Sequence, residues 1–363
     1  MHFELSTPTW NHRTYFQTVL FGPETIGELP RIVEEIPHSS VLLVASRSAL
    51  SSRFGEILCG LLADQRLSVF DAVQQHSPEA AVQSATQIVS RMQAPAVISF
   101  GGGSAIDTAK AVVAGLDPNA PAHIAIPTTY SGAEMTGFFG VKDESSRSKI
   151  GGGHPETVAQ TVIYDPLATI AVPLALSVAT AINALAHGVE ALFSDLRTPE
   201  VELLSREVIT IMSADLPLLE IEPHSVDVRT RLMLGAYFAG RVLQNARTGL
   251  HHVISQIIGS YAGIPHGVAN AVMLPHTFEA QKPYFASQAR VVEELLASSG
   301  DGFDLRRLSR LGQVHAGLRA SGVDRRDLAE IALRTVQNPK VRELSWATST
   351  FVKRILEAAY EDS

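Results

Sequence analysis

This 363-residue chain has a single cysteine and fewer basic than acidic residues. Cys59 is its only cysteine, which excludes an internal disulfide, a zinc site of several thiolates and a Cys-x-x-Cys redox pair. Lys and Arg together number 29 against 37 Asp and Glu, so the formal net charge is −8. The chain therefore lacks the basic excess typical of nucleic-acid-binding proteins, and we expect no nucleic-acid partner.

The sequence also lacks a recognisable targeting or membrane-spanning segment. The first five residues, Met1–Leu5, do not have the basic and then apolar build of a signal peptide. The stretch Thr169–Ala186 carries no charge, but it contains Pro173 and polar groups that would each need a partner in lipid. We expect a buried helix there, no contact with a membrane and a cytoplasmic location.

The pattern of apolar residues predicts two domains, as does the length at about 150 residues per domain. Short apolar runs, which favour strands buried on both faces, alternate with helical segments in the first 165 residues. They are Val41–Ala45, Val97–Phe100 and Ile124–Ile126, with helices from Ser77-Pro78-Glu79 to Met92 and over Ala105–Ala114. Ser77 is the predicted N-cap of the first of these helices. Helical spacing dominates from residue 166 onward, so we predict an α/β domain over 1–165 and an all-helical domain over 166–363.

Two loops indicate phosphate binding at one edge of the predicted parallel sheet. Gly101-Gly102-Gly103-Ser104 stands where a strand gives way to a helix, and consecutive glycines let the backbone approach a phosphate at a helix N-terminus. The glycine loop alone is as typical of a tight turn as of a phosphate site. Pro127–Gly132 follows the next strand and supplies hydroxyl groups at the same edge, and the two loops together favour nucleotide binding.

The end of the first predicted strand bears on which dinucleotide is used. An acidic residue there would hold the 2′-hydroxyl of the adenosine ribose, but this chain has Ser46-Arg47. Arg47 is either an exposed turn residue or a partner for the 2′-phosphate of NADP. We expect that NADH and NADPH can both serve.

Polar side chains in the helical half predict a lined cavity. Asn183 and His187 are four residues apart and so lie on one helix face, among apolar neighbours. His251-His252 opens another helix, and His266 and His276 each follow a proline. One buried imidazole is usually a satisfied core residue, whereas several on separate elements favour a binding site.

These motifs resemble the iron-dependent (group III) alcohol dehydrogenase superfamily, whose fold is that of dehydroquinate synthase. The matching segments stand in the family's order: GGGSAIDTAK at Gly101–Lys110, PTTYSGAEMT at Pro127–Thr136, NALAHGVEA at Asn183–Ala191 and PHGVANAVMLPH at Pro265–His276. The resemblance implies an NAD(P)-dependent oxidoreductase that forms a homodimer. The residues that we assign to the cofactor are Ser46, Gly101, Gly102, Gly103, Ser104, Asp107, Thr128, Thr129, Ser131 and Lys149.

The resemblance also places the family's metal at positions that match Asn183, His187, His252 and His266. The family's first ligand is an aspartate, and this chain has Asn183 instead. Three neutral imidazoles and an amide leave a divalent ion without an anionic ligand, although three histidines can still hold zinc. We therefore expect no metal.

Within the superfamily, NALAH and TTYSGAEMT resemble maleylacetate reductases, which work without a metal. That subgroup tends to have a lysine and a histidine after its His-His pair, where this chain has Val253 and Gln256. PHGVAN and GGGSAIDTAK are more similar to the general dehydrogenases.

The reaction that this resemblance implies is hydride transfer to the activated carbon–carbon double bond of maleylacetate, which gives 3-oxoadipate in the breakdown of aromatic compounds. His187 and His252 would contact the enolate or its carboxylate, and His251 or His266 would deliver the proton. A dicarboxylate needs cations, and Arg241, Arg247 and Lys149 are candidates, although each is more often a solvated surface charge. We assign Tyr130 and Arg247 to the substrate.

Two other interpretations remain open. The first is an alcohol or aldehyde dehydrogenase of the same superfamily, with zinc or iron on the histidines. The second is a nucleotide-binding protein without activity, in which Asn183 marks a lost site. The intact histidines argue against the second, because an inactive site has no need to keep them.

Overall fold

The chain divides into two compact units. This computed structural model describes residues 11–36, 40–74, 77–116, 120–143, 148–299, 304–313 and 317–362. One unit comprises Thr14–Val172 and His224–Leu234, and the other comprises Pro173–Pro223, the chain from Gly235 onward and the described residues before Thr14. The sequence-based boundary after Asp165 compares with a division between Val172 and Pro173 in the structure.

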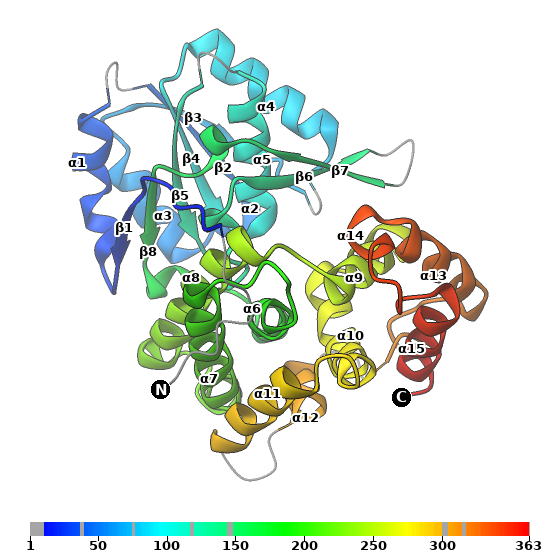
Figure 1. The fold of residues 1–363 in the computed structure, drawn as a ribbon. Helices are drawn as coiled ribbons and strands as arrows, with labels where there is room; N and C mark the ends of the chain where they lie inside the picture. The colour runs from blue at the N-terminus through cyan, green and yellow to red at the C-terminus, as the bar shows by residue number, and fades with distance from the viewer. Residues whose placement is uncertain are drawn as a thin grey trace. The chain divides into compact units, whose positions relative to one another are not determined.

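The first unit is built on a parallel sheet (Figure 1). In the described residues the strand order is β1-β8-β5-β4-β2-β3, and every neighbouring pair is parallel. A separate antiparallel hairpin is formed by β6 and β7. The strands are β1 Thr18–Phe21, β2 Ser40–Ala45, β3 Arg66–Phe70, β4 Ala96–Gly101, β5 Ala122–Pro127, β6 Phe138–Asp143, β7 Ser148–Gly153 and β8 Thr161–Tyr164.

Helices cover both faces of the sheet, because β2 and β4 are apolar on both sides. Val41 and Leu43 of β2 pack with Leu29 and Leu58 on one face, whereas Leu42 packs with helices on the other face. This is the expected arrangement for parallel strands with continuous apolar runs. The helices of this unit are α1 Leu29–Glu34, α2 Arg47–Leu50, α3 Arg53–Leu61, α4 Glu79–Met92 and α5 Gly103–Ala114.

The second unit is helical throughout its described residues, as expected from the sequence (Figure 1). Its central helix α6 packs against α7 and α10, and α10 packs in turn against α9. The α8 helix begins in the first unit and ends in the second. The helices are α6 Leu174–Leu192, α7 Pro199–Ile221, α8 Val226–Ala246, α9 Leu250–Ala262, α10 His266–Gln281, α11 Ala286–Ser298, α12 Leu305–Ser309, α13 Leu328–Gln337, α14 Pro339–Arg342 and α15 Ser349–Glu361.

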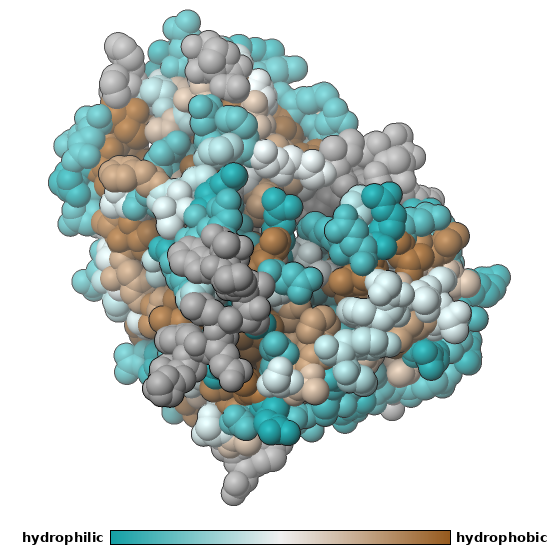
Figure 2. Space-filling view, viewed as in Figure 1, coloured by the Kyte–Doolittle hydropathy of each residue, from teal (hydrophilic) through white to brown (hydrophobic). Residues whose placement is uncertain are grey.

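The α6 helix contains most of the uncharged stretch noted in the sequence. Among the described residues it is the one helix long and apolar enough to cross a membrane, but 78% of that window is buried inside the protein. A buried core helix passes the same test of length and composition. Figure 2 shows that apolar side chains on the visible face lie among polar ones, which is ordinary for a protein surface.

The structure confirms the predicted helices and strands but corrects one detail at the start of α4. Pro78, not Ser77, is the N-cap residue of this helix. Ser77 has a left-handed backbone with φ +49° and its hydroxyl donates to the backbone oxygen of Ser104, 3.0 Å away. The serine therefore contacts the start of α5 instead of capping its own helix.

Candidate functional site

The glycine loop lies between β4 and α5, as predicted. Gly101 has φ +148°, in the region that favours glycine, and Gly102 is the N-cap of α5. The structure gives α5 no side-chain hydrogen bond at its cap and no acidic residue in its first turn. The first backbone N–H groups of a helix attract anions, so this end of α5 suits a phosphate.

The second loop lies directly against the first. A Cβ atom added to Gly102 would be 3.0 Å from the side chain of Thr129, and one added to Gly103 would be 3.4 Å from the hydroxyl of Ser131. The predicted convergence of the two loops is thus confirmed, since β4 and β5 are neighbours. Among the described residues the buried Thr129 hydroxyl has no hydrogen-bond partner, so it is available to a ligand atom. These features fit the phosphates of a dinucleotide.

Two charged residues of α5 fix the surroundings of this loop pair. The Lys110 ammonium donates to the backbone oxygens of Ala133 and Phe138 and to the hydroxyl of Thr136. The Asp107 carboxylate accepts the backbone N–H of Gly140 in β6. Asp107, predicted to contact the cofactor, therefore joins α5 to the hairpin. The side chain of Lys149, also predicted for the cofactor, lies outside the described residues.

The residues after β2 do not leave a free arginine at the sheet edge. Ser46 is the N-cap of α2, and its hydroxyl accepts the N–H of Ala49. The Arg47 guanidinium lies 2.9 Å from the carboxylate of Asp71, which follows β3. The sequence analysis missed Asp71 because it comes from a neighbouring strand. An acidic group is thus present beside Ser46 after all.

The histidine cluster is formed within the helical unit by α6, α9 and α10. Asn183 and His187 lie one turn apart on α6, and both are buried. His251 and His252 open α9 and are buried too, whereas His266, the first residue of α10, keeps partial access to solvent. The helices that carry these residues pack against one another, so the predicted grouping is confirmed at the level of the helices.

Glu190 of α6 organises the start of α9, and the sequence analysis missed it. Its Oε1 accepts the backbone N–H groups of His251 and His252 at 2.7 and 3.4 Å, and its Oε2 lies 2.7 Å from Nδ1 of His252. A carboxylate can only accept, so Nδ1 of His252 carries the proton and Nε2 is a lone pair when the ring is neutral. The spacing from His187 to Glu190, three residues along one helix, was the available signal.

His251 is held on its other side by α10. Its Nδ1 lies 2.9 Å from the Thr277 hydroxyl, which itself donates to the backbone oxygen of Met273. Nδ1 of His251 is therefore the donor in this contact. Among the described residues, Nε2 of His252 is buried without a hydrogen-bond partner.

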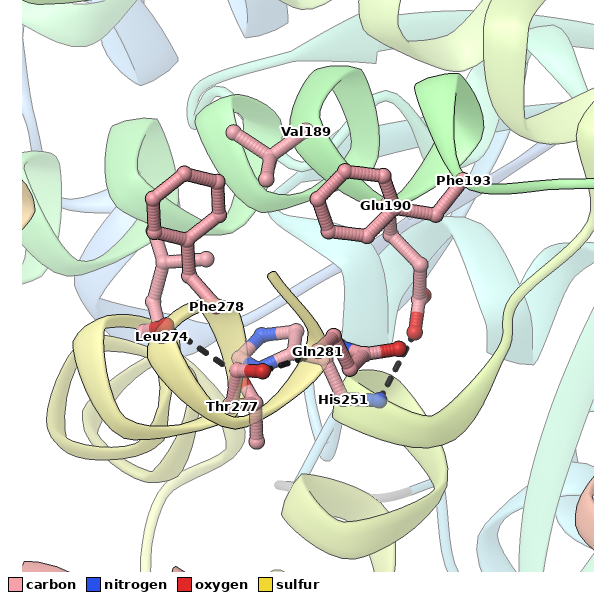
Figure 3. A pocket seen from close by; sticks show the side chains of 8 residues that line it. All are labelled: Val189, Glu190, Phe193, His251, Leu274, Thr277, Phe278 and Gln281. Carbon is pink, nitrogen blue, oxygen red and sulfur yellow. Dashed lines mark hydrogen bonds between the residues drawn. The ribbon is translucent and has the colours of Figure 1, made fainter. Parts of the chain in front are cut away.

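A small cavity lies beside His251 within the same unit (Figure 3). Figure 3 shows the Glu190 side chain extending toward the His251 backbone and the His251 ring beside Thr277. The cavity has room for about one water and not for an organic substrate. Its lining residues are Val189, Glu190, Phe193, His251, Leu274, Thr277, Phe278 and Gln281.

Asn270 of α10 joins Asn183 to His266. Its amide nitrogen donates to Asn183 Oδ1 at 2.7 Å and lies 3.1 Å from Nε2 of His266. Because an amide nitrogen only donates, Nε2 of His266 accepts and a neutral His266 keeps its proton on Nδ1. Both rings, when neutral, therefore carry their proton on Nδ1. In His252 this proton faces Glu190 and Nε2 keeps a lone pair, whereas in His266 the Nε2 lone pair faces Asn270.

Burial keeps the inner imidazoles neutral. Burial, together with the neighbouring His252, lowers the pKa of His251 to about 3. Burial also lowers the pKa of His187 and the pKa of His252 well below the usual range of a histidine. The neighbouring His252 adds to the lowering for His187, and His266 adds to it for His252. The rings of His187 and His252 stack with centroids 4.0 Å apart and planes 6° apart, so a charge on one would repel a charge on the other.

The side chains as they stand do not fit a metal ion. The rings of His187 and His252 are nearly parallel, and an imidazole nitrogen ligates in its ring plane, so an ion cannot lie on both lone-pair axes. His266 Nε2 has a single lone pair, which the Asn270 amide already occupies. In the part of the chain that the structure describes, no three His, Cys, Asp or Glu side chains converge as metal ligands.

The two residues predicted to contact substrate lie in different settings. Tyr130 is fully buried, and its hydroxyl is 3.5 Å from the guanidinium of Arg229. The assignment of Tyr130 to the substrate stays a prediction. Arg247 is exposed and follows α8 with a left-handed backbone, φ +59°.

Comparisons with known proteins agree with this architecture. A profile described as "Iron-containing alcohol dehydrogenase" matches residues 17–166, and one described as "Fe-containing alcohol dehydrogenase family, C-terminal" matches residues 177–360. The chain is 32% identical to maleylacetate reductase 1 of Cupriavidus pinatubonensis over 90% of this chain and 88% of the relative. The crystal structure of maleylacetate reductase from Agrobacterium tumefaciens is similar with a TM-score of 0.86 and 25% identity, over 98% of this chain and 99% of the other. That of a 1,3-propanediol oxidoreductase has a TM-score of 0.90 at 21% identity, over 97% and 100% of the two chains, which shows the shared fold.

Proposed function

Because the chain belongs to the iron-containing alcohol dehydrogenase family of NAD(P)-dependent oxidoreductases, we propose that it reduces maleylacetate, or a similar 4-oxo-enoate, to 3-oxoadipate. The relatives named maleylacetate reductase support this substrate class, since several are about 30% identical over about 90% of the chain. The proposal includes a metal-independent reaction and a role in the breakdown of aromatic compounds.

The observation that carries the proposal is the hydrogen-bond chain from Asn183 through Asn270 to His266. The family resemblance places a metal at these positions, with an aspartate where Asn183 stands. Here the asparagine oxygen and the His266 Nε2 lone pair serve one amide group instead of an ion. An enolate is easier to stabilise than an alkoxide, so a double bond conjugated to a ketone can be reduced where a simple ketone would need a metal.

The N-terminal unit has the features that a dinucleotide needs. Its glycine loop presents the backbone N–H groups at the start of α5, and Thr129 and Ser131 offer hydroxyls beside them. When bound, the reduced nicotinamide supplies a hydride to the alkene carbon β to the ketone, which leaves an enolate that takes a proton at the α carbon. The net reaction consumes one reduced cofactor and one proton for each substrate.

The histidines divide the remaining work according to their tautomers. His266 keeps a proton on Nδ1 and has access to solvent, so it is our choice as the group that delivers the proton. His251 is buried with its Nδ1 proton directed at Thr277, which makes it a support for His252. The stacked, neutral rings of His187 and His252 would contact the enolate or its carboxylate.

A second candidate function, an alcohol or aldehyde dehydrogenase that uses zinc or iron, is favoured by one contact. A ring whose Nδ1 proton is held by a carboxylate, as Glu190 holds that of His252, is the common arrangement for a histidine that ligates a metal through Nε2. Movement of His187 and release of His266 from Asn270 would be needed to complete such a site.

Metal analysis combined with kinetics tests the two functions. We expect purified protein without stoichiometric metal to oxidise NADH or NADPH with maleylacetate, and a chelator to leave this rate unchanged. Bound metal with chelator-sensitive turnover of simple aldehydes, and no turnover of maleylacetate, would establish the second function instead. The proposal also includes a homodimer in the cytoplasm, and sedimentation at several concentrations tests the dimer.

A further inference from the structure

Lys340 is a cation close to the histidine cluster that the reaction as described leaves unused. It lies on the short helix α14, where the side-chain oxygen of Asn338 accepts its backbone N–H, and α14 packs against α9. Its ammonium donates to the Thr248 hydroxyl, two residues before α9 begins. It interacts electrostatically with His187, His252 and Glu190.

This ammonium lacks an acidic partner. Within the described residues no carboxylate lies within ion-pair distance of Lys340, although Glu190 acts on it from farther away. The Lys340 residue is exposed to solvent, but the protein atoms around its ammonium partly exclude water. This partial burial lowers the pKa of the ammonium, and the nearby Arg247 lowers it further. Two cations held near each other, with no carboxylate in ion-pair contact among the described residues, favour the binding of an anion.

The backbone around Arg247 supports the same conclusion. Arg247 ends α8 in a left-handed conformation, at a position where glycine or asparagine is usual. Two residues later, a Cβ atom at Gly249 would be 3.1 Å from Glu190 Oε1, so this segment is fixed against the cluster. The guanidinium is exposed and has no carboxylate partner in the described residues. Strained positions that keep a long charged side chain are often functional.

We propose that Lys340, Thr248 and Arg247 form a subsite that binds a carboxylate of the substrate beside the histidine cluster and so selects an oxo acid over a neutral ketone or aldehyde. This inference rests on the proposed reduction of a 4-oxo-enoate. The same cations could bind a phosphate of the dinucleotide, and the experiment separates the two anions.

The variants are Lys340→Met, which keeps the length of the side chain, and Arg247→Gly, which removes the guanidinium and relieves the backbone. Lys353→Met is the matched control, because Lys353 is an exposed lysine of α15 whose ion-pair partner is Glu357. Three quantities are measured: kcat/KM for maleylacetate and for the carboxyl-free enone 3-penten-2-one, the Kd of glutarate by calorimetry, and the Kd of NADH by fluorescence.

We expect Lys340→Met and Arg247→Gly each to lower kcat/KM for maleylacetate about 10- to 100-fold, the range of one charge-assisted hydrogen bond. Glutarate binding should weaken by a similar factor, while 3-penten-2-one turnover and NADH binding stay within about twofold. Arg247→Gly should also keep or raise Tm, which separates loss of the subsite from loss of folding.

Weakened NADH binding with unchanged glutarate binding would overturn the proposal and assign these cations to the cofactor. Equal losses for maleylacetate and 3-penten-2-one would overturn it as well, because a structural role affects both. If the wild-type protein does not reduce maleylacetate, the proposed function fails, and the binding of glutarate alone tests the subsite. Glutarate binding by the wild type that is lost in Lys340→Met would support the subsite, and no glutarate binding by the wild type would overturn it.

Discussion

The Oε2 atom of Glu190 lies 2.7 Å from Nδ1 of His252, and both side chains are buried. The same carboxylate accepts the backbone N–H groups at the start of α9 through its other oxygen. One side chain therefore sets the position of the helix and the tautomer of the ring. The chemistry of His252 depends on a residue of a different helix, far away in the sequence.

The Glu190→Gln variant tests this dependence. The oxygen of the introduced amide can still accept one N–H group at the helix start, but the amide nitrogen would face Nδ1 of His252 and favour the opposite tautomer. We expect kcat to fall about 10- to 100-fold, and the free energy of unfolding by about 1–3 kcal/mol. Unchanged kcat with lower stability would show that Glu190 acts only as a helix cap. Steady-state kinetics and urea unfolding measure the two effects, and the Kd of NADH should not change.

The buried imidazoles predict a loss of stability in acid. The pKa of His251 is about 3 in the folded protein and returns to about 6.5 on unfolding, so between these values the unfolded chain binds the extra proton. Stability is therefore fully present above about pH 6.5 and falls by about 1.4 kcal/mol per pH unit for this group as the pH drops toward 3. His251→Gln should flatten the pH dependence of urea unfolding between pH 6 and 4 by about that slope.

His123→Gln is a matched comparison in the other unit. Burial lowers the pKa of His123 to about 3 as well, and its Nε2 lies 2.9 Å from the Ser99 hydroxyl. This variant should flatten the pH dependence of unfolding for the sheet-containing unit without a change in turnover. An unchanged slope in both variants would contradict the burial argument.

A methyl group in the glycine loop should impair the cofactor site while leaving the fold intact. In Gly102→Ala the new Cβ would approach Thr129 to 3.0 Å, which forces that side chain aside. We expect the Kd of NADH to rise at least about tenfold, because the backbone and the hydroxyl can no longer approach one phosphate together. Gly60→Ala is the control, since nothing lies within 4 Å of its added Cβ. Equal NADH affinity in both variants would locate the phosphates elsewhere.

The pair of Arg47 and Asp71 predicts how the two nicotinamide cofactors are discriminated. The Asp71 carboxylate would repel the 2′-phosphate of NADPH, while Arg47 would attract it, and both side chains are exposed. We expect Asp71→Asn to raise the ratio of kcat/KM for NADPH to that for NADH about tenfold, and Arg47→Ala to lower it. No change of this ratio in either variant would place the adenosine ribose away from the pair.

The sequence predicted the elements whose periodicity is strong and missed those that pairing defines. β2, β4 and β5 are central strands with continuous apolar runs, so their composition was sufficient. β1, β3, β8 and the β6–β7 hairpin were not predicted. The edge strands β1 and β3 and the glycine-rich hairpin carry little hydrophobic pattern, and β8 is only four residues long. Pairing partners supply the stability that local sequence does not show.

The site was predicted where family motifs or helical spacing placed its residues. Asn183 and His187 share a helix face, and the glycine loop follows a strand, so both features could be predicted from the sequence. Glu190, Asn270 and Lys340 were not, because each has a partner that is distant in the sequence.

The position of β4 and β5 in the strand order has a consequence for motion. Both phosphate loops extend from this central pair, which has parallel neighbours on each side and is buried along its length. Amide protons in such strands exchange with solvent only when most of a sheet opens, whereas edge strands exchange through local fraying. We therefore expect both loops to be rooted in the slowest-exchanging part of the unit. A dinucleotide bound there, as proposed, would then shift only the few residues beyond Gly101 and Pro127.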